Sequence, residues 1–287
     1  MSGRVWMAMA AGVLMMAGVA RAEHYDVFVL AGQSNMDGRA KVADLKGDLE
    51  KYAGPQADVK IAYSDSTARG APLSSKGWEE LKPGFSVTTG KEKPRALPGP
   101  TFGPELSFGR AMADALGKQH HVAIIKFAEG GTSLAKDWKV GTDGKLYAQM
   151  LAFVSKSLDD MKAHGDTFEL RGFVWHQGES DATLTAEQYE KLLTNLIEHV
   201  RTDLKPYRGN AAGELPVVVG EVYDNHQRDS ILAAQRSVCE KVKDCALAGS
   251  NGLNTFDKGT HFDAESQIEM GKRMAAAMLT MLKGGPE

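Results

Sequence analysis

Short hydrophobic runs alternate with longer amphipathic stretches along most of the chain, most regularly after residue 100. Apolar runs of strand length, bounded by glycine and polar residues, are typical of buried strands, whereas apolar positions spaced by three or four residues indicate helices. We therefore expect strands at 27–31, 59–63, 121–127, 170–175, 216–223 and 246–248, and helices at 103–116, 146–164, 185–204, 229–242 and 264–282. Repeated units of this kind predict an α/β domain with a central parallel sheet covered on both faces.

The regular pattern is interrupted between residues 41 and 100, a stretch rich in Gly, Pro, Ser and Lys. A long irregular segment in a compact domain is usually functional or mobile, and we expect this insertion to wall the functional site. No internal repeat or low-complexity tract marks a domain boundary. The sequence therefore predicts a single domain at 23–287 with a loop-rich insertion around 41–100.

The first 22 residues have the pattern of a secretory signal peptide. Arg4 supplies a positive charge, residues 6–19 form an uncharged apolar run, and Ala20-Arg21-Ala22 is a small-x-small cleavage site. An uncleaved anchor is the alternative, but the run is short for a membrane span and no later segment is long enough. We expect cleavage after Ala22, a secreted or periplasmic protein, and no membrane association after cleavage.

Charge and cysteine content narrow the function classes. The net charge is −3 with lysines and arginines scattered along the chain, so no basic face is formed and we expect no nucleic-acid partner. Cys239 and Cys245 are the only cysteines. Export favours a disulfide between them, and two free thiols are the alternative.

Residues with catalytic chemistry gather where predicted strands end. Ser34 follows the strand at 27–31, and paired glycines that include Gly131 follow the strand at 121–127. Gln177 and Glu179 follow the strand at 170–175, and His261 precedes the last helix. Because the carboxyl ends of parallel strands meet at one edge of the sheet, we expect these side chains to converge on one rim. They would supply a nucleophile, a backbone N–H, an amide, a carboxylate and a base, which together suit acyl transfer through an oxyanion hole.

A zinc site is the alternative use of the same rim. His176, Glu179 and His261 are the residues that would form it. No pair of them has the i, i+4 helical spacing that a zinc hydrolase motif would use, so we expect no metal.

These turns resemble the sequence blocks of the SGNH-hydrolase superfamily. Within it they resemble the branch of carbohydrate acetylesterases that includes acetyl xylan esterases and sialate O-acetylesterases. The matching blocks are Gly32-Gln33-Ser34-Asn35-Met36, Gly130-Gly131, Trp175-His176-Gln177-Gly178-Glu179-Ser180-Asp181 and His261-Phe262, with Phe102-Gly103-Pro104-Glu105 between them. The resemblance implies a flavodoxin-like three-layer α/β/α sandwich and serine esterase chemistry without a cofactor.

The resemblance also implies roles for individual residues. Ser34 would attack the acetyl carbonyl, and His261 would accept its proton. The oxyanion would be held by the backbone N–H groups of Ser34 and Gly131 and by the side-chain amide of Gln177. Substrate contacts are assigned to Gln33, Asn35, His176, Trp138 and Asn225, and Trp78 and Trp138 are candidate walls on which a sugar could stack.

The acid that supports His261 has two candidates. The superfamily usually places this acid three residues before the histidine, but here residues 258–260 separate Asp257 from His261. Either the loop bulges so that Asp257 reaches the imidazole, or Glu179 takes the role. The resemblance to acetyl xylan esterases suggests the second arrangement, and we slightly prefer Glu179. Asp37 also departs from the small residue usual after the nucleophile block, and only a charge near a helix N-terminus offers a reason for it.

These features predict an exported serine esterase that removes O-acetyl groups from carbohydrate, such as acetylated xylan, through an acetyl-serine intermediate. Its partner would be an acetylated oligo- or polysaccharide. A sialate O-acetylesterase is one alternative, and a lipid or thioester hydrolase of the same superfamily is another, although the polar insertion argues against an apolar groove. A catalytically inactive carbohydrate-binding module is the alternative from a different class, and the retention of Ser34, Gln177 and His261 argues against it.

Overall fold

The structure, a computed structural model, describes residues 22–64, 74–86, 100–117, 120–142, 145–209 and 211–284. The expected signal peptide lies outside the described residues except for Ala22, and so do parts of the insertion at 41–100. Within the described ranges, none of the helices combines the length and the apolar character needed to cross a bilayer.

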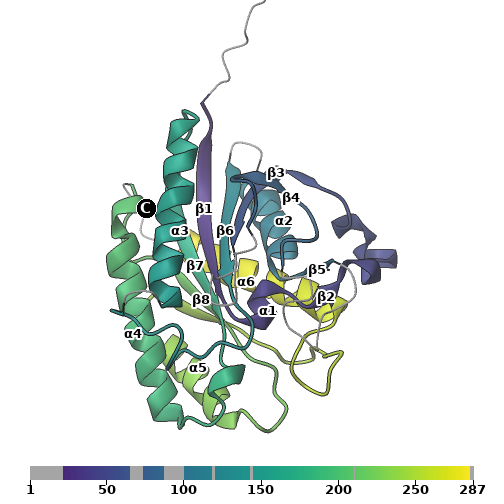
Figure 1. Cartoon of the computed structure of the whole chain (residues 1–287), viewed down its shortest axis with the longest axis vertical. Helices are drawn as coiled ribbons and strands as arrows, with labels where there is room; N and C mark the ends of the chain where they lie inside the picture. The colour runs from purple at the N-terminus through teal and green to yellow at the C-terminus, as the bar shows by residue number, and fades with distance from the viewer. Residues whose placement is uncertain are drawn as a thin grey trace, which may run out of the picture.

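Strand β1 (His24–Gly32) lies near the centre of a seven-stranded sheet with the order β4-β3-β6-β1-β7-β8-β9 (Figure 1). The other strands are β3 (Gln56–Ser64), β4 (Glu79–Leu81), β6 (His121–Ala128), β7 (Thr167–His176), β8 (Val217–Gly220) and β9 (Cys245–Ala248). Neighbouring strands pair in parallel except at one edge, where β4 runs antiparallel to β3. The predicted α/β class with a central, mostly parallel sheet is confirmed.

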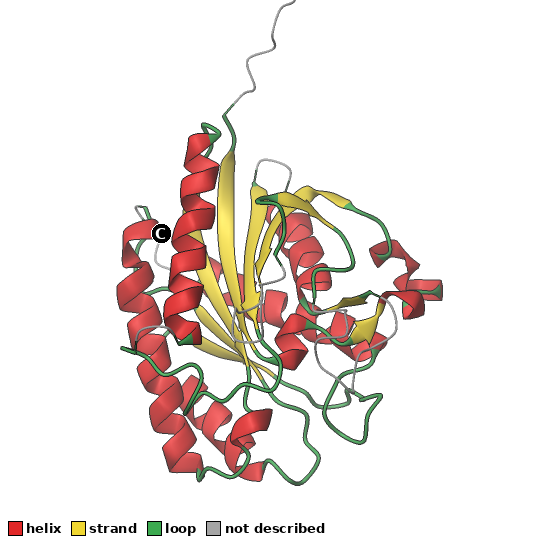
Figure 2. Cartoon of the chain, viewed as in Figure 1, coloured by secondary structure: helices red, strands yellow, loops and turns green. Residues whose placement is uncertain are grey.

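Helices cover both faces of this sheet and produce the three layers that can be followed in Figure 2. One face packs against α3 (Leu146–Ala163), α4 (Ala186–Leu204) and α5 (Asp229–Lys241), and the other against α2 (Glu105–Leu116) and α6 (Ala264–Lys283). Successive side chains of a strand point to opposite faces, so Val29 joins the first core and Phe28 the second. Because both faces of β1 are buried, its sequence from Val27 to Ala31 is a continuous apolar run with no polar alternation.

The described part of the insertion has more regular structure than the sequence predicted. It holds β2 (Ala40–Lys41), which pairs with β5 (Thr101–Phe102), the 3-10 helices η1 (Val42–Asp44) and η2 (Gly47–Tyr52), and strand β4. These elements are too short to give a clear hydrophobic period, so only β3 could be predicted from the pattern.

Two helices begin at side-chain caps. Thr185 caps α4 in a reciprocal arrangement, in which its Oγ1 accepts from Gln188 N at 3.2 Å and Gln188 Oε1 accepts from Thr185 N at 3.0 Å. Asp263 caps α6 by accepting from Ser266 N at 2.9 Å. The second cap fixes the end of the loop that carries His261.

The two cysteines lie together where α5 ends and β9 begins. The Sγ atoms of Cys239 and Cys245 are 2.9 Å apart as free, half-buried thiols. Their hydrogen bond, together with burial, raises the pKa of the Cys239 thiol. The fold therefore brings the pair together, and the disulfide stays a prediction.

Candidate active site

Ser34 opens α1 (Ser34–Asp37), directly after β1 ends at Gly32. Here β1 and β7 approach so closely that a Cβ on Gly32 would lie 2.0 Å from the carbonyl oxygen of His176, and Gly32 has a φ of +151°. A side chain is excluded at this position because its Cβ would collide with the backbone of His176. The close approach brings the turn with Ser34 next to the loop that follows β7, at the carboxyl edge of the sheet.

Ser34, His261 and Asp257 form a chain of contacting side chains. His261 Nε2 lies 2.9 Å from Ser34 Oγ, and His261 Nδ1 lies 2.5 Å from Asp257 Oδ2. A proton on Nδ1 shared with the carboxylate leaves Nε2 as the acceptor for the serine proton. This arrangement is the one that a serine nucleophile, a base and a supporting acid would need.

The loop before α6 accommodates the extra residue between Asp257 and His261. Lys258 and Gly259 have positive φ values of +37° and +94°, and the second is a conformation that glycine adopts without strain. This bulge folds the carboxylate back, so that Asp257 Oδ1 also accepts from His261 N at 2.6 Å. The acid is thereby held at both the backbone and the imidazole of His261.

Glu179 does not contact the imidazole. It lies in the 3-10 helix η3 (Glu179–Asp181), and its Oε1 accepts from Asn35 Nδ2 at 2.6 Å. The geometry therefore contradicts our preference for Glu179 as the partner of His261 and favours Asp257. The preference failed because a bulge set by two backbone dihedral angles cannot be read from the spacing of residues.

Asn35 is buried and its side chain contacts two other loops of the site. Besides Glu179, its Nδ2 donates to the carbonyl oxygen of Thr260 at 2.9 Å, and its Oδ1 accepts from Phe262 N at 3.2 Å. The side chain is 1% exposed. In this structure its contacts hold both neighbours of His261, and its role in substrate contact stays a prediction.

The amide of Gln177 is occupied inside the protein. Gln177 is fully buried, and its Nε2 donates to Asp181 Oδ2 at 2.6 Å and to the carbonyl oxygen of Thr132 at 3.0 Å. Its Oε1 accepts from Tyr189 Oη at 3.0 Å. Both donor hydrogens have acceptors inside the protein, so the oxyanion contact that we expected of this side chain stays a prediction. It links the loop after β7 to the glycine loop.

Asp181 also links the loop after β7 to the glycine loop. Its buried carboxylate accepts from Ser133 Oγ at 2.6 Å and from Leu134 N at 2.7 Å, in addition to Gln177. Asp137, four residues after Ser133, accepts from Ser133 N at 2.8 Å. The loop that carries Gly131 is therefore held by two carboxylates.

Two backbone N–H groups remain for an oxyanion. Within the described ranges, neither Ser34 N nor Gly131 N donates to a protein acceptor. Gly131 is exposed and has a φ of +73°, which a glycine adopts readily. Both groups lie at the rim where the sequence placed them, and they are the donors that the geometry leaves available.

Two further residues assigned to substrate contact are buried. Gln33 is 2% exposed, and its Oε1 accepts from Gln177 Nε2 at 3.1 Å and from Ser180 N at 3.3 Å. His176 is fully buried and its ring packs against Phe262, so desolvation lowers its pKa, with the charge of Glu179 acting in the opposite direction. Both residues support the loops beneath the site.

Trp138 and Asn225 were also expected to contact substrate, and the structure places them differently. Trp138 is fully buried, packs edge-to-face on Trp175, and donates from Nε1 to Thr132 Oγ1 at 3.0 Å. It belongs to the core, because an aromatic residue in a loop can turn inward as readily as outward. Asn225 reaches the rim, but its Nδ2 donates to the carbonyl oxygen of Gly259 at 3.0 Å.

The sequence reasoning missed Arg228 and Phe256. Arg228 donates to the carbonyl oxygen of Gly259 at 2.7 Å and to Thr260 Oγ1 at 3.1 Å, so it fixes the bulge. Phe256 stacks on the imidazole of His261 with ring centroids 5.9 Å apart, and it is 46% exposed, the only exposed large hydrophobic residue in the described part of the chain. Its position next to Asp257 was the available signal.

A buried polar network lies behind the nucleophile and accounts for Asp37. The Asp37 carboxylate accepts from Tyr63 Oη at 2.8 Å and pairs with Arg39. Lys126 Nζ donates to the Asp37 carbonyl oxygen and to Glu105 Oε2, both at 2.7 Å. Burial raises the pKa of Glu105, and the Lys126 ammonium opposes that shift. The network anchors the end of α1, which is why an acid stands after the nucleophile block.

Two clusters of described residues have a geometry that could hold a metal ion. One is His24, Asp26 and Glu169, where Arg171 already neutralises both carboxylates, and the other is the exposed group Asp224, His226 and Asp229. Neither cluster includes a member of the chain from Ser34 to Asp257.

Comparison with known proteins places the sequence in a family of carbohydrate esterases. Residues 24–280 match the profile of the family described as carbohydrate esterase, sialic acid-specific acetylesterase. A protein of Arabidopsis thaliana named as a probable carbohydrate esterase is 27% identical over 259 residues, which cover 88% of this chain and 90% of that protein.

Solved structures share the fold. An Arabidopsis thaliana protein has a TM-score of 0.64 at 24% identity, covering 91% of this chain and 99% of that one. NanS has a TM-score of 0.65 at 14% identity, covering 91% and 98%. A carbohydrate acetylesterase from Xanthomonas citri has a TM-score of 0.60 at 18% identity, covering 90% and 56%. With the family profile matching almost the whole described chain, the protein belongs to the carbohydrate esterase, sialic acid-specific acetylesterase family.

Proposed function

We propose that this protein is a serine esterase that removes O-acetyl groups from carbohydrate through an acetyl-serine intermediate. The observation that carries the proposal is the contact chain from Ser34 Oγ through His261 to Asp257, at 2.9 Å and 2.5 Å. Membership of a carbohydrate esterase family supports the choice of substrate class.

In the first half of the reaction, Ser34 Oγ attacks the acetyl carbonyl carbon while His261 Nε2 takes the hydroxyl proton. The negative charge that develops on the carbonyl oxygen is stabilised by the N–H groups of Ser34 and Gly131. When the intermediate collapses, the sugar oxygen leaves with the proton from His261, and the acetyl group stays on Ser34.

In the second half, a water molecule attacks the acetyl-serine, and His261 accepts a proton from it. The second tetrahedral intermediate collapses to acetate, and the serine oxygen regains its proton from His261. Asp257 keeps the imidazole in the tautomer that both halves need and stabilises its charged form. The Asp257 carboxylate is itself oriented by the His261 backbone N–H at 2.6 Å.

The position of Phe256 favours a saccharide as the substrate at this rim. One face of its ring covers the His261 imidazole, and nearly half of the side chain is exposed to solvent. A pyranose can place its apolar C–H face against such a ring while its acetylated hydroxyl reaches Ser34. A platform of this size suits a sugar ring better than an acyl chain, which would need a long apolar groove.

We also propose that the protein is exported and that its leader is removed after Ala22. The small-x-small pattern at 20–22 supports this, and the first strand begins two residues later, at His24. The exported protein would meet acetylated oligo- or polysaccharide outside the cytoplasm. Mass spectrometry of the protein purified from its host should find Glu23 as the first residue.

The deciding experiment is acetate release from a panel of acetylated saccharides: acetyl xylan, O-acetyl sialic acid and an acetylated uronan. We expect release from at least one of them by the wild type and its loss in Ser34→Ala. Saccharide binding without acetate release would indicate an inactive binding module. Cleavage of long-chain acyl esters at rates above those of every acetylated sugar would indicate a lipid hydrolase.

A further inference from the structure

A cavity of about 540 Å³ lies at the opposite end of the sheet from Ser34. Tyr25 lines it from the start of β1, and Met161 and His164 line it where α3 ends. Strand β1 rises roughly 3.3 Å per residue, so its length separates this cavity from the catalytic rim by roughly 20 Å. The volume is in the range of sites that bind small molecules, of roughly 300–1,000 Å³.

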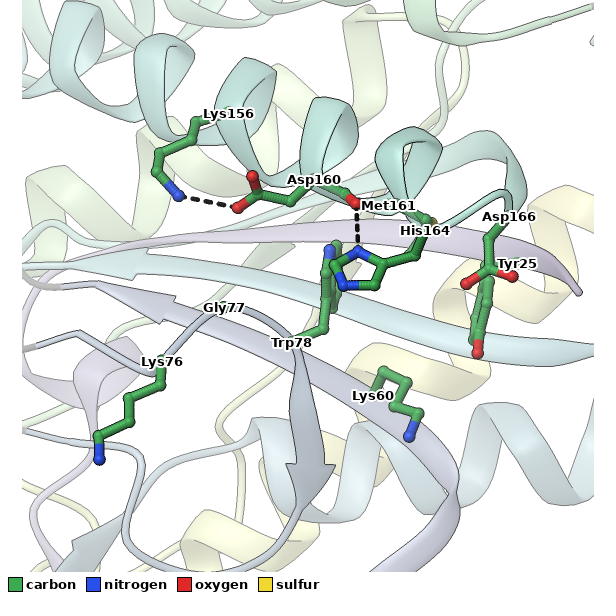
Figure 3. Close-up of a pocket in the computed structure, with 10 residues that line it drawn as sticks. All are labelled: Tyr25, Lys60, Lys76, Gly77, Trp78, Lys156, Asp160, Met161, His164 and Asp166. Atoms are coloured by element: carbon green, nitrogen blue, oxygen red, sulfur yellow. Dashed lines mark hydrogen bonds and ion pairs between the residues drawn. The ribbon is translucent and has the colours of Figure 1, made fainter. Parts of the chain in front are cut away.

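Trp78 forms an aromatic wall of this cavity (Figure 3). Its Nε1 donates to the carbonyl oxygen of Ser157 at 2.8 Å, and the side chain packs against the core on the α3 side of the sheet. The indole is therefore held in place before any ligand arrives, which lowers the entropy cost of binding. Together with Met161, it offers an apolar surface that suits the C–H face of a sugar ring.

Positive charge surrounds this wall. Figure 3 shows Lys60 on one side of Trp78 and the pair of Lys156 and Asp160, joined at 2.8 Å, on the other. Lys60 and Lys76 have no acidic partner within the part of the chain that the structure describes. The remaining carboxylate is that of Asp166, which accepts from Glu23 N at 3.0 Å. The Lys60 ammonium beside a fixed indole, with Lys76 farther away, favours a ligand that has both a carboxylate and an apolar face.

We propose that this cavity is a second saccharide-binding site that takes a carboxylate-bearing pyranose, such as a uronic acid residue. The ring stacks on Trp78, and the carboxylate binds Lys60, whereas the Lys76 ammonium, which points away from Lys60 in Figure 3, adds positive charge only from a distance. An inorganic anion would leave the wall of Trp78 and Met161 unused, and a neutral sugar would leave the Lys60 ammonium without a partner. The choice of a saccharide rests on the proposed function, but this site takes no part in ester cleavage and would hold an acidic polymer near the enzyme.

Isothermal titration calorimetry with trigalacturonate tests the proposal, and xylotriose and sodium sulfate serve as comparison ligands. We expect trigalacturonate to bind the wild type and Ser34→Ala equally, and at least about tenfold more tightly than xylotriose. Lys60→Glu should weaken trigalacturonate binding by about tenfold or more, because a repulsive charge replaces an attractive one at a half-buried position that lines the cavity. Lys191→Glu makes the same charge change at an exposed position of α4, away from the cavity, and should leave binding unchanged.

Three results would overturn the inference. They are no binding of trigalacturonate to the wild type, equal binding to Lys60→Glu and the wild type, and displacement by sulfate at equal concentration, which would leave only a simple anion site. Trp78→Phe separates the aromatic part, since it keeps a ring and should retain more binding than Trp78→Ala. Hydrolysis of ethyl acetate by the Lys60 and Trp78 variants should match the wild type, so failure here is distinguishable from failure of the proposed esterase activity.

Discussion

Asn35 Nδ2 donates to Glu179 Oε1 at 2.6 Å, and this contact gives Glu179 a role other than that of the acid in the catalytic chain. Through the same amide, the loop after β7 is linked to the carbonyl oxygen of Thr260, directly before His261. Glu179 therefore acts on the histidine through Asn35 and the backbone, whereas Asp257 touches the imidazole.

Asp257→Asn and Glu179→Gln should separate these two roles. Asp257→Asn removes the charge beside Nδ1 and favours the wrong tautomer, so kcat on an acetyl ester should fall by roughly 10³- to 10⁴-fold. Glu179→Gln keeps a hydrogen-bond acceptor for Asn35, and its loss should stay within about tenfold. Steady-state kinetics on ethyl acetate with both variants checks this, and a larger loss in Glu179→Gln would return the acid role to Glu179.

Asp181→Asn should weaken catalysis by loosening the glycine loop. The variant places an amide N–H₂ among donors from Ser133, Leu134 and Gln177, so at least one buried hydrogen bond is lost. Because Gly131 lies on this loop, kcat should fall by roughly 10- to 100-fold, less than the loss of an oxyanion donor itself, while KM changes little.

The control for this prediction is Asp203→Asn. Asp203 also accepts a hydroxyl hydrogen bond, from Tyr147 Oη at 2.6 Å, but it lies in α4 away from the rim. Its kcat should equal that of the wild type. If both variants lose stability equally and neither loses kcat, Asp181 has only a structural role.

The position of the site could be predicted from the sequence, because it depends on topology. Buried parallel strands give continuous apolar runs, and their carboxyl ends share one edge, so Ser34 and the loop after β7 had to meet. Where each side chain points depends instead on local geometry. The bulge at Lys258 and Gly259, the inward turn of Trp138 and the internal hydrogen bonds of Gln177 follow from dihedral angles and packing that residue types alone do not set.

Phe256→Ala should affect saccharides more than small esters. Removing the exposed ring takes away the stacking surface, so kcat/KM on an acetylated oligosaccharide should fall by about five- to tenfold, mainly through KM. Ethyl acetate has no ring to stack and should lose less. Phe256→Tyr keeps the platform and should restore saccharide turnover. Equal losses on both substrates would mean that Phe256 only supports the His261 imidazole.

His176 should make the protein less stable in mild acid. Burial lowers its pKa in the folded protein, whereas the unfolded chain has a histidine pKa of about 6.5. Above that pH both states are neutral and the stability does not change. As the pH falls from about 6.5 towards the folded-state pKa, the unfolded chain binds a proton that the folded protein does not. The free energy of unfolding should then drop by up to about 1.4 kcal/mol per pH unit.

Glu105 works in the opposite direction, so the measurement needs a variant that isolates His176. The raised pKa of Glu105 makes the folded protein bind a proton more readily than the unfolded chain, which adds stability as the pH falls. Urea unfolding between pH 5 and 8 should therefore be compared for the wild type and His176→Phe, which keeps a ring against Phe262. The absolute stability of the variant does not matter here, because the comparison uses only the change in the free energy of unfolding with pH, which reports proton uptake by His176. An equal slope in both proteins below about pH 6.5 would show that His176 takes up its proton in the folded state as readily as in the unfolded chain.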